Sequence, residues 1–179
     1  MSEAKEAKVK GNERISSLYL EATKRFTNKE IDALLPVYNQ KISQLKLDTF
    51  TAIKKNCEEY KWFREHGSIE FNEKTGYIRI TNTEKSKSEE NKKKLLDFNE
   101  CAKLISLKQN QLFDKISEKN KEIIKDYSNC LKTCEQLIDT TTDELGIKCF
   151  GGCIEALDQE NAKKFEYVDK KLEEISKRL

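Results

Sequence analysis

The residues of this chain with the richest chemistry are six cysteines, four of which form two evenly spaced pairs. Cys130 and Cys134 are four positions apart, and so are Cys149 and Cys153. Cysteine thiols form disulfide bonds in oxidising compartments, whereas a set of cysteines in a cytosolic protein more often binds metal or does redox chemistry. The spacing of the pairs must therefore decide between a disulfide framework, a metal site and a redox-active site.

Each C-x3-C pair has the spacing of two neighbours on one face of a helix. Residues i and i+4 lie one turn apart, roughly 6 Å along the helix axis. If two antiparallel helices follow one another through a short turn, Cys134 meets Cys149 nearest the turn. Cys130 then meets Cys153 one turn farther away. A crossed pairing would need parallel helices, so we predict nested disulfides, at the Cα separation of about 5.5–6 Å that disulfides prefer.

This pairing also predicts which residues face each other farther along the two helices. The residue numbers of facing pairs should sum to 283, as those of Cys130 and Cys153 do. Within one residue, this rule places apolar residues opposite apolar residues: Tyr127 and Leu157, Ile116 and Val168, Leu112 and Leu172, Ile105 and Leu179. Because these apolar stripes are independent of the cysteines, their agreement favours a long helical hairpin that ends in a coiled-coil seam.

The segments NCLKTC at 129–134 and CFGGCI at 149–154 resemble the small Tim family of the mitochondrial intermembrane space. The resemblance covers roughly residues 104–179, and the matching positions are the four cysteines of the two motifs. It implies a helix–loop–helix with nested disulfides, import without a presequence through an oxidative relay, and assembly into hexamers that chaperone apolar membrane-protein precursors. The apolar residues Ile123, Ile124 and Tyr127 also resemble the docking face of that import route, although core packing explains them equally well.

The two glycines of the second motif and the two remaining cysteines have simpler interpretations. Gly151 and Gly152, inside the second motif, should each weaken its helix by about 1 kcal/mol relative to alanine. Counting residues back from the expected hairpin places Cys57 nearer residue 93 than Cys101. We therefore expect these two cysteines to be packed thiols, with a disulfide between them as the alternative. For the two motifs themselves, a zinc site of four thiolates, a redox-active pair and reduced buried thiols remain as alternatives to disulfides.

The elements that would position the cysteines are mostly helices. Charged residues make up 37% of the chain and hydrophobic residues 36%, with only six glycines and one proline, a balance typical of long helices with narrow apolar seams. We expect residues 1–14 to be disordered or loosely attached. The predicted elements after them are a helix over 15–26, a helix from a Thr27 cap to about 64 with Pro36 near its start, strands over 69–71 and 77–80, a helix over 84–141, and a helix ending at 179.

These elements predict a mostly α fold of elongated helices, with a small β-hairpin and a C-terminal, disulfide-linked antiparallel helical hairpin. We divide the chain into an N-terminal arm over 1–26, a helix and β-hairpin over 27–83, and a Tim-like helical hairpin over 84–179. An isolated β-hairpin and long helices with thin seams are marginal in water, so we expect both to need partner surface.

Several classes of function are disfavoured by the same composition. The net charge is only +2, and acidic and basic residues alternate along the chain, so we expect no nucleic-acid partner. No segment approaches the roughly 20 apolar residues of a transmembrane span. The first residues have the pattern of neither a secretory signal nor a matrix presequence. With His66 as its single histidine and no glycine-rich phosphate loop, the chain is not expected to be an enzyme, and we assign no catalytic, cofactor-binding or metal-binding residues.

The functional expectation follows from the motif and from the N-terminal hundred residues, which have no counterpart in small Tims. We expect a non-catalytic, Tim-like accessory subunit of a mitochondrial inner-membrane complex, such as one of the respiratory chain, that faces the intermembrane space and lies peripheral to the membrane. Its partners would be other protein subunits, including other Tim-like chains in a hetero-oligomer. A chaperone of the small-Tim type and a cytosolic zinc-binding helical adaptor are the alternatives.

Overall fold

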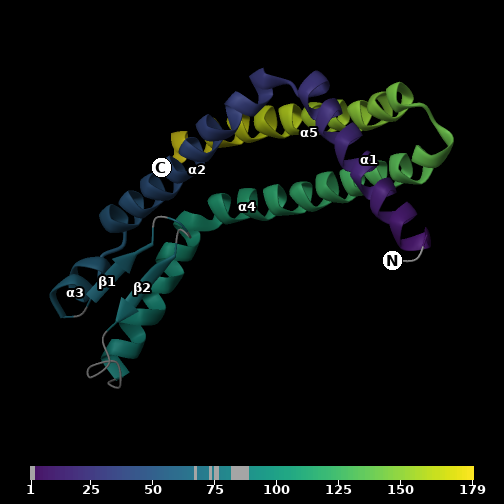
Figure 1. The fold of residues 1–179 in the computed structure, drawn as a ribbon. Coiled ribbons are helices and arrows are strands. Elements are labelled where there is room, and N and C mark those ends of the chain that lie inside the picture. The colour runs from purple at the N-terminus through teal and green to yellow at the C-terminus, as the bar shows by residue number, and fades with distance from the viewer. Residues whose placement is uncertain (1–2, 67, 73, 75–76, 82–88) are drawn as a thin grey trace. The chain divides into compact units, whose positions relative to one another are not determined.

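The computed structural model describes residues 3–66, 68–72, 74, 77–81 and 89–179, without the side chains of 3–11 and of a few residues beside the gaps. Figure 1 shows that the fold is mostly helical, as predicted. The described elements, in chain order, are α1 (Glu3–Phe26), α2 (Lys29–Asn56), α3 (Glu59–His66), β1 (Ser68–Phe71), β2 (Ile78–Thr81), α4 (Glu89–Leu137), the 3-10 turn η1 (Ile138–Thr140) and α5 (Asp143–Arg178).

The N-terminal helix is longer than predicted. Residues 3–14 are helical, not disordered, and continue into the predicted helix over 15–26 to form α1. Alanine, glutamate and lysine dominate the first turns of this segment, and all three have high intrinsic helix propensity. Farther along α1, Leu18 and Ala22 are buried, so this part of the helix is packed against the rest of the protein.

The predicted helix from residue 27 to about 64 is two helices. α2 begins one residue later than predicted, because the side chain of Asn28, and not that of Thr27, accepts the hydrogen bond of a first-turn amide, the N–H of Glu30. α2 runs through Pro36 and ends at Asn56. α3 follows after a tight turn in which the Tyr60 N–H donates to the Cys57 carbonyl oxygen.

The small β-hairpin is confirmed and packs against helices. β1 and β2 are antiparallel, with Ile69 opposite Ile80 and Phe71 opposite Ile78. Ile69 and Ile78 pack against a cluster of buried side chains from α2, α3 and α4. The hairpin thus has the partner surface that a two-stranded sheet needs to be stable in water.

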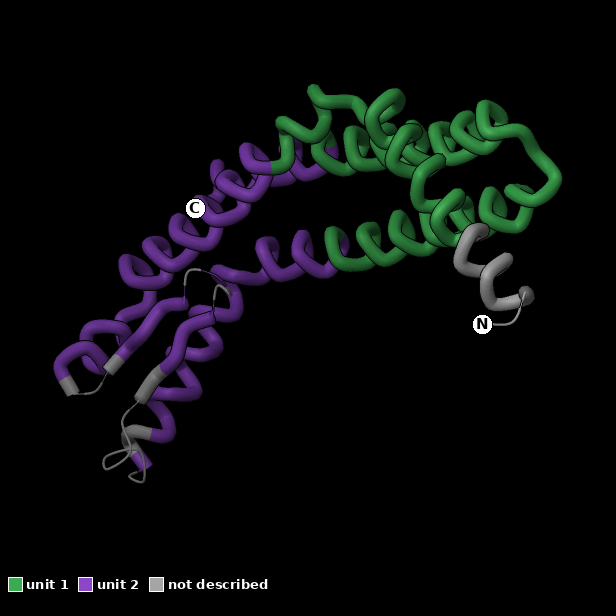
Figure 2. Tube along the Cα trace, viewed as in Figure 1, with its two compact units in different colours: residues 1–35, 116–166 green, residues 36–115, 167–179 purple. Residues whose placement is uncertain are grey.

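The chain forms two compact units, each assembled from segments that are distant in sequence (Figure 2). Unit 1 contains residues 1–35 and 116–166, and unit 2 contains residues 36–115 and 167–179. The buried core of unit 1 gathers around the two C-x3-C motifs. The cluster under the hairpin in unit 2 consists of Ile53, Cys57, Phe63 and Phe98.

The expectation that Cys57 and Cys101 are free thiols is wrong, because they form a disulfide in unit 2. Their Cα atoms are 5.9 Å apart, which is the usual separation for such a bond. That expectation came from counting residues back from the β-hairpin along one continuous helix. Because α2 ends at Asn56 and α3 is a separate element, that count does not locate Cys57.

Ile105, which the register was predicted to place opposite Leu179, packs against a different set of side chains in unit 2. Its neighbours belong to the cluster that contains Phe98, while 40% of the Leu179 surface is exposed. In this unit α2 contacts both of the other long helices. Lys41 of α2 pairs with Asp169 of α5 at 2.9 Å, and the Lys46 ammonium lies 5.5 Å from the ring centre of Phe113 in α4.

Removal of the disulfide in unit 2 tests its contribution to stability. The bond closes a loop with a sequence separation of 44, so the double substitution Cys57→Ala and Cys101→Ala should lower the free energy of unfolding by roughly 3–4 kcal/mol. Urea unfolding followed by the fluorescence of Trp62, the single tryptophan, measures the change. Labelling of Cys57 or Cys101 by a thiol reagent in the folded, unreduced wild type would contradict the bond.

Candidate functional site

The two C-x3-C motifs lie on the facing sides of α4 and α5 in unit 1. Cys130 is bonded to Cys153 and Cys134 to Cys149, each with a Cα separation of 5.8 Å. These are the nested pairs derived from the spacing of the motifs. The end of α4 and the start of α5 run antiparallel and are joined through η1 (Figure 1).

The register set by the cysteines continues along unit 1. The ammonium of Lys164 donates to the Asn120 side-chain oxygen at 2.9 Å, and the numbers of these two residues sum to 284, one more than those of the disulfide pairs. Burial lowers the pKa of Lys164, because a charged ammonium is poorly solvated between packed helices. The antiparallel pairing therefore extends about ten residues beyond the outer disulfide.

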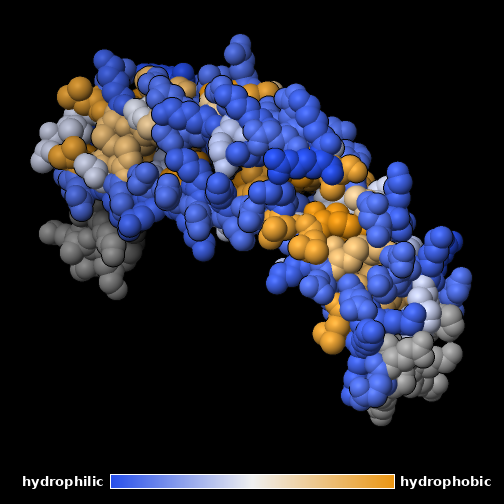
Figure 3. All heavy atoms as spheres, turned by 180° about the vertical axis from the view of Figure 1, so that it is seen from behind, coloured by the Kyte–Doolittle hydropathy of each residue, from blue (hydrophilic) through white to orange (hydrophobic). Residues whose placement is uncertain are grey.

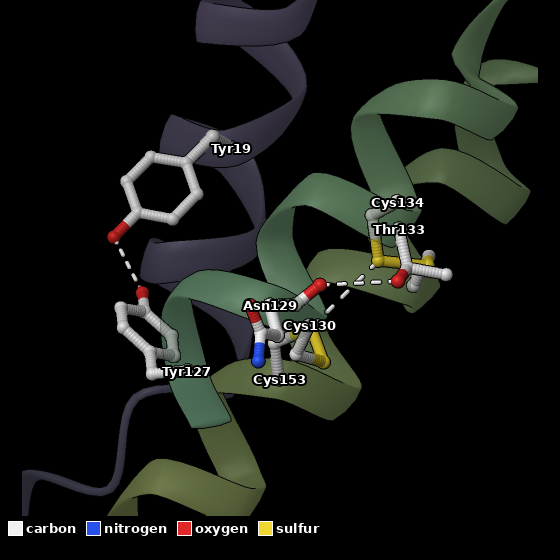
Figure 4. The surroundings of a disulfide bond; sticks show 8 residues. Tyr19, Tyr127, Asn129, Cys130, Thr133, Cys134 and Cys153 are labelled. Atoms are coloured by element: carbon white, nitrogen blue, oxygen red, sulfur yellow. Dashed lines mark hydrogen bonds between the residues drawn. A yellow bond between two sulfur atoms is a disulfide. The ribbon is translucent and has the colours of Figure 1, made fainter. Parts of the chain in front are cut away.

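The sulfur atoms of the two disulfides are close neighbours (Figure 4). The Sγ atoms of Cys134 and Cys153, which belong to different bonds, are 3.7 Å apart. Both residues are buried, with 2% and 1% of their surface exposed, and the Sγ atoms of these two and of Cys130 all lie within 4.8 Å of one another. Three thiolates at this distance could hold a metal ion, but sulfur binds zinc only as thiolate, so metal binding would require reduction of both bonds.

Helix α1 crosses the pair formed by α4 and α5 (Figure 1) and packs against the disulfides, a position that the sequence did not predict. Leu18 and Ala22 belong to the same buried cluster as Cys134 and Cys153. The ring of Tyr19 meets that of Phe150 edge to face, with centroids 5.8 Å apart. The apolar spacing over 15–26 identified a helix, but nothing in its local pattern says which surface it covers.

Gly151 is required by the close approach of α1 to α5. A Cβ atom at position 151 would overlap three ring carbons of Phe26, whereas a Cβ at Gly152 would meet no atom within 4 Å. The two glycines therefore differ: both lower helix propensity, but only Gly151 also makes room for a neighbouring side chain. The absence of a side chain there lets the Phe26 ring lie directly on the helix backbone between the two cysteines.

An arginine of α1 holds the connection between α4 and α5. Arg14 donates to the carbonyl oxygens of Ile138 and Thr141, both at 2.8 Å, and to the carboxylate of Asp143 at 3.0 Å. The last carbonyls of a helix have no partner within the helix, and the guanidinium supplies donors for this connection. The charge also suits the negative end of the α4 dipole.

Two further contacts attach the end of α1 to α5. Arg25 pairs with Glu144 at 3.0 Å, and its hydrogen bonds to Glu144 and Glu21 raise the pKa of the exposed guanidinium. The buried carboxylate of Asp158 accepts the N–H of Asn28 at 2.8 Å. This bond satisfies the buried acid and attaches the chain to α5 at the point where α2 begins.

Two tyrosines form a hydrogen-bonded pair beside the outer disulfide (Figure 4). The hydroxyl oxygens of Tyr19 and Tyr127 are 2.6 Å apart. Burial raises the pKa of Tyr127 above its usual value of 10.0, and the hydrogen bond with Tyr19 and the charge of Asp158 act in the same direction. The Tyr127 phenol therefore holds its proton more strongly than a free tyrosine does.

Comparison with known proteins yields no match for this chain among family models, curated proteins or solved structures. The resemblance to small Tims thus rests on the two motifs. In the part of the chain that the structure describes, no helix is long and apolar enough to cross a membrane.

The two glycines of the second motif provide a matched pair of substitutions. Gly151→Ala should lower the free energy of unfolding by about 1–3 kcal/mol, because the methyl group overlaps the Phe26 ring. Gly152→Ala should raise it by about 0.5–1 kcal/mol, because alanine favours the helix and the position is open. Denaturant unfolding of the oxidised protein measures both changes. Equal effects of the two substitutions would contradict the packing of Phe26 on Gly151.

The raised pKa of Tyr127 predicts a loss of stability in alkali. Below pH 10 the phenol is protonated in both the folded and the unfolded chain, so its contribution to stability is complete. Above pH 10 the unfolded chain loses this proton first, and the free energy of unfolding should fall by up to about 1.4 kcal/mol per pH unit from this group. Urea unfolding from roughly pH 8 to 11 should show a shallower fall for Tyr127→Phe. Equal slopes for wild type and variant would contradict the shift.

Proposed function

We propose that this protein is a non-catalytic, Tim-like structural subunit of the mitochondrial intermembrane space, built into a larger assembly on the inner membrane, with complexes of the respiratory chain as the first candidates. The observation that carries the proposal is the pairing of all six cysteines in three disulfides. Structural disulfides persist in oxidising compartments and are rare in the reducing cytosol. The nested twin C-x3-C hairpin narrows the choice to the intermembrane space by its resemblance to small Tims.

A structural role is supported by where the unusual groups lie. Tyr127 and Lys164, whose pKa values are shifted, have their polar atoms bound to neighbouring side chains of packed helices. Catalytic groups with shifted pKa values usually converge on a cleft. The buried carboxylate of Asp158 is used in the same way, since it binds the backbone at the start of α2.

Assembly with other proteins is supported by apolar side chains on the outer faces of the helices. Five of them are exposed over more than half of their surface: Leu20, Leu96, Leu104, Ile124 and Leu145. Single exposed leucines are common on soluble proteins, but several on helices whose opposite faces are already buried suit a subunit with neighbours. The same exposed groups would serve a chaperone of apolar precursors, which is the second candidate.

Fractionation of mitochondria from cells that express the full chain tests the proposal. The protein should resist protease in intact mitochondria and be digested once the outer membrane is ruptured. On native gels of mild-detergent extracts it should migrate with a large membrane complex. A small soluble assembly would favour the chaperone, and a cytosolic, reduced protein with bound zinc would favour the adaptor.

Cysteine variants sharpen this experiment. If the chain enters by oxidative trapping, Cys130→Ser with Cys153→Ser should lower the amount retained in the intermembrane space. The matched control is Cys57→Ser with Cys101→Ser, which removes a disulfide from unit 2 and leaves both C-x3-C pairs intact. Equal loss of the two variants would point to general instability and would contradict import through the twin motif.

A further inference from the structure

The outer face of α4 in unit 2 carries leucines where a helix packed on one side usually carries polar residues. Leu96 and Leu104 are each exposed over 69% of their surface, and Leu107 over 40%. On the same stretch of helix, Phe98 and Gln109 are buried, at 1% and 4%. Leu96 and Leu107 lie within about 20° of each other around the helix axis and nearly opposite Phe98. Figure 3 shows that apolar side chains reach the surface between the hydrophilic residues that cover most of the visible face.

Two exposed, oppositely charged residues lie between the leucines on the same face. The positions Leu96, Glu100, Lys103 and Leu107 follow one another in steps of four, three and four. This is the spacing of a seam between two paired helices. The face therefore has apolar residues at its two ends, with an acid and a base between them.

When two copies of this segment run antiparallel, each of the four residues faces a residue of complementary type. In an antiparallel pair of identical helices, Leu96 of one copy would face Leu107 of the other, and Glu100 would face Lys103. A two-fold axis repeats both contacts, which gives two leucine pairs and two ion pairs. In a parallel pair each glutamate would face the same glutamate of the other copy, so the charges select the antiparallel arrangement.

We propose that this face of α4 binds a second copy of the chain in that antiparallel register. Leu104 adds apolar surface along one flank, and next beyond the seam Lys93 would face the uncharged Asn110. A contact made by one helix face from each copy is smaller than a typical obligate interface, so the dimer should be reversible and dependent on concentration. The inference does not depend on the compartment or on the assembly proposed above.

Sedimentation equilibrium of the oxidised full chain over a range of concentrations tests the proposal. The wild type should dimerise reversibly. Glu100→Lys and Lys103→Glu should each raise the dissociation constant by at least about tenfold, because each turns two attractive contacts into two repulsive ones. The control is Glu135→Lys, which makes the same change in net charge as Glu100→Lys at an exposed position of α4 outside the seam and should leave the dissociation constant unchanged.

Mixing the two single variants decides the register. Glu100→Lys in one copy and Lys103→Glu in the other restore attraction at both charged positions, so the mixture should form heterodimers although neither variant dimerises well alone. The double variant, which carries both substitutions, should also dimerise like the wild type. An ion pair within one helix could not be restored by mixing. A wild type that stays monomeric, or a mixture without heterodimers, would overturn the proposal.

Discussion

Antiparallel helices that share only a narrow apolar seam bury little surface, and their relative position can slip by a turn at small cost. The disulfides Cys130–Cys153 and Cys134–Cys149 remove this freedom in unit 1, because two bonds one turn apart permit a single register of α4 against α5. Lys164 and Asn120 keep that register farther along the same helices. The buried residues of α1 pack against the surface whose geometry these bonds define.

The main such surface is the one that α1 covers. Phe26 lies on the backbone of α5 at Gly151, between the cysteines of the second motif, and Arg14 binds the carbonyls of the connection between the helices. In an isolated helix, this glycine would only be destabilising. In unit 1 it allows a third helix, α1, to cover the disulfides. The core of unit 1 is therefore built from α1, α4 and α5, and Cys134 and Cys153 are almost completely buried in it.

Unit 2 has the same construction on different elements. A thin cluster of apolar side chains under the β-hairpin includes the disulfide between Cys57 and Cys101. Each unit thus combines a small core with its own covalent link, and an oxidising compartment is the setting in which such a protein holds together. The dependence on disulfides supports the proposed location. The exposed leucines of α4 support the proposed role in assemblies.

The sequence by itself determined most of the local structure and the pairing within the C-terminal hairpin, although it missed the helical residues 3–14 and the helix break after Asn56. Helices, the β-hairpin and the nested bonds all follow from regular spacings, since four-residue and two-residue periods report which side chains share a face. Only the tertiary structure decided that Cys57 bonds Cys101, that α1 covers the twin motif, and that α2 contacts both α4 and α5 in unit 2. These contacts join segments separated by 44 to 131 residues, and their geometry depends on where each helix ends, as α2 does at Asn56. A local sequence period does not encode the position of such a helix end. The two C-x3-C pairs, by contrast, are joined by one short turn, so their spacing alone predicts which cysteines meet.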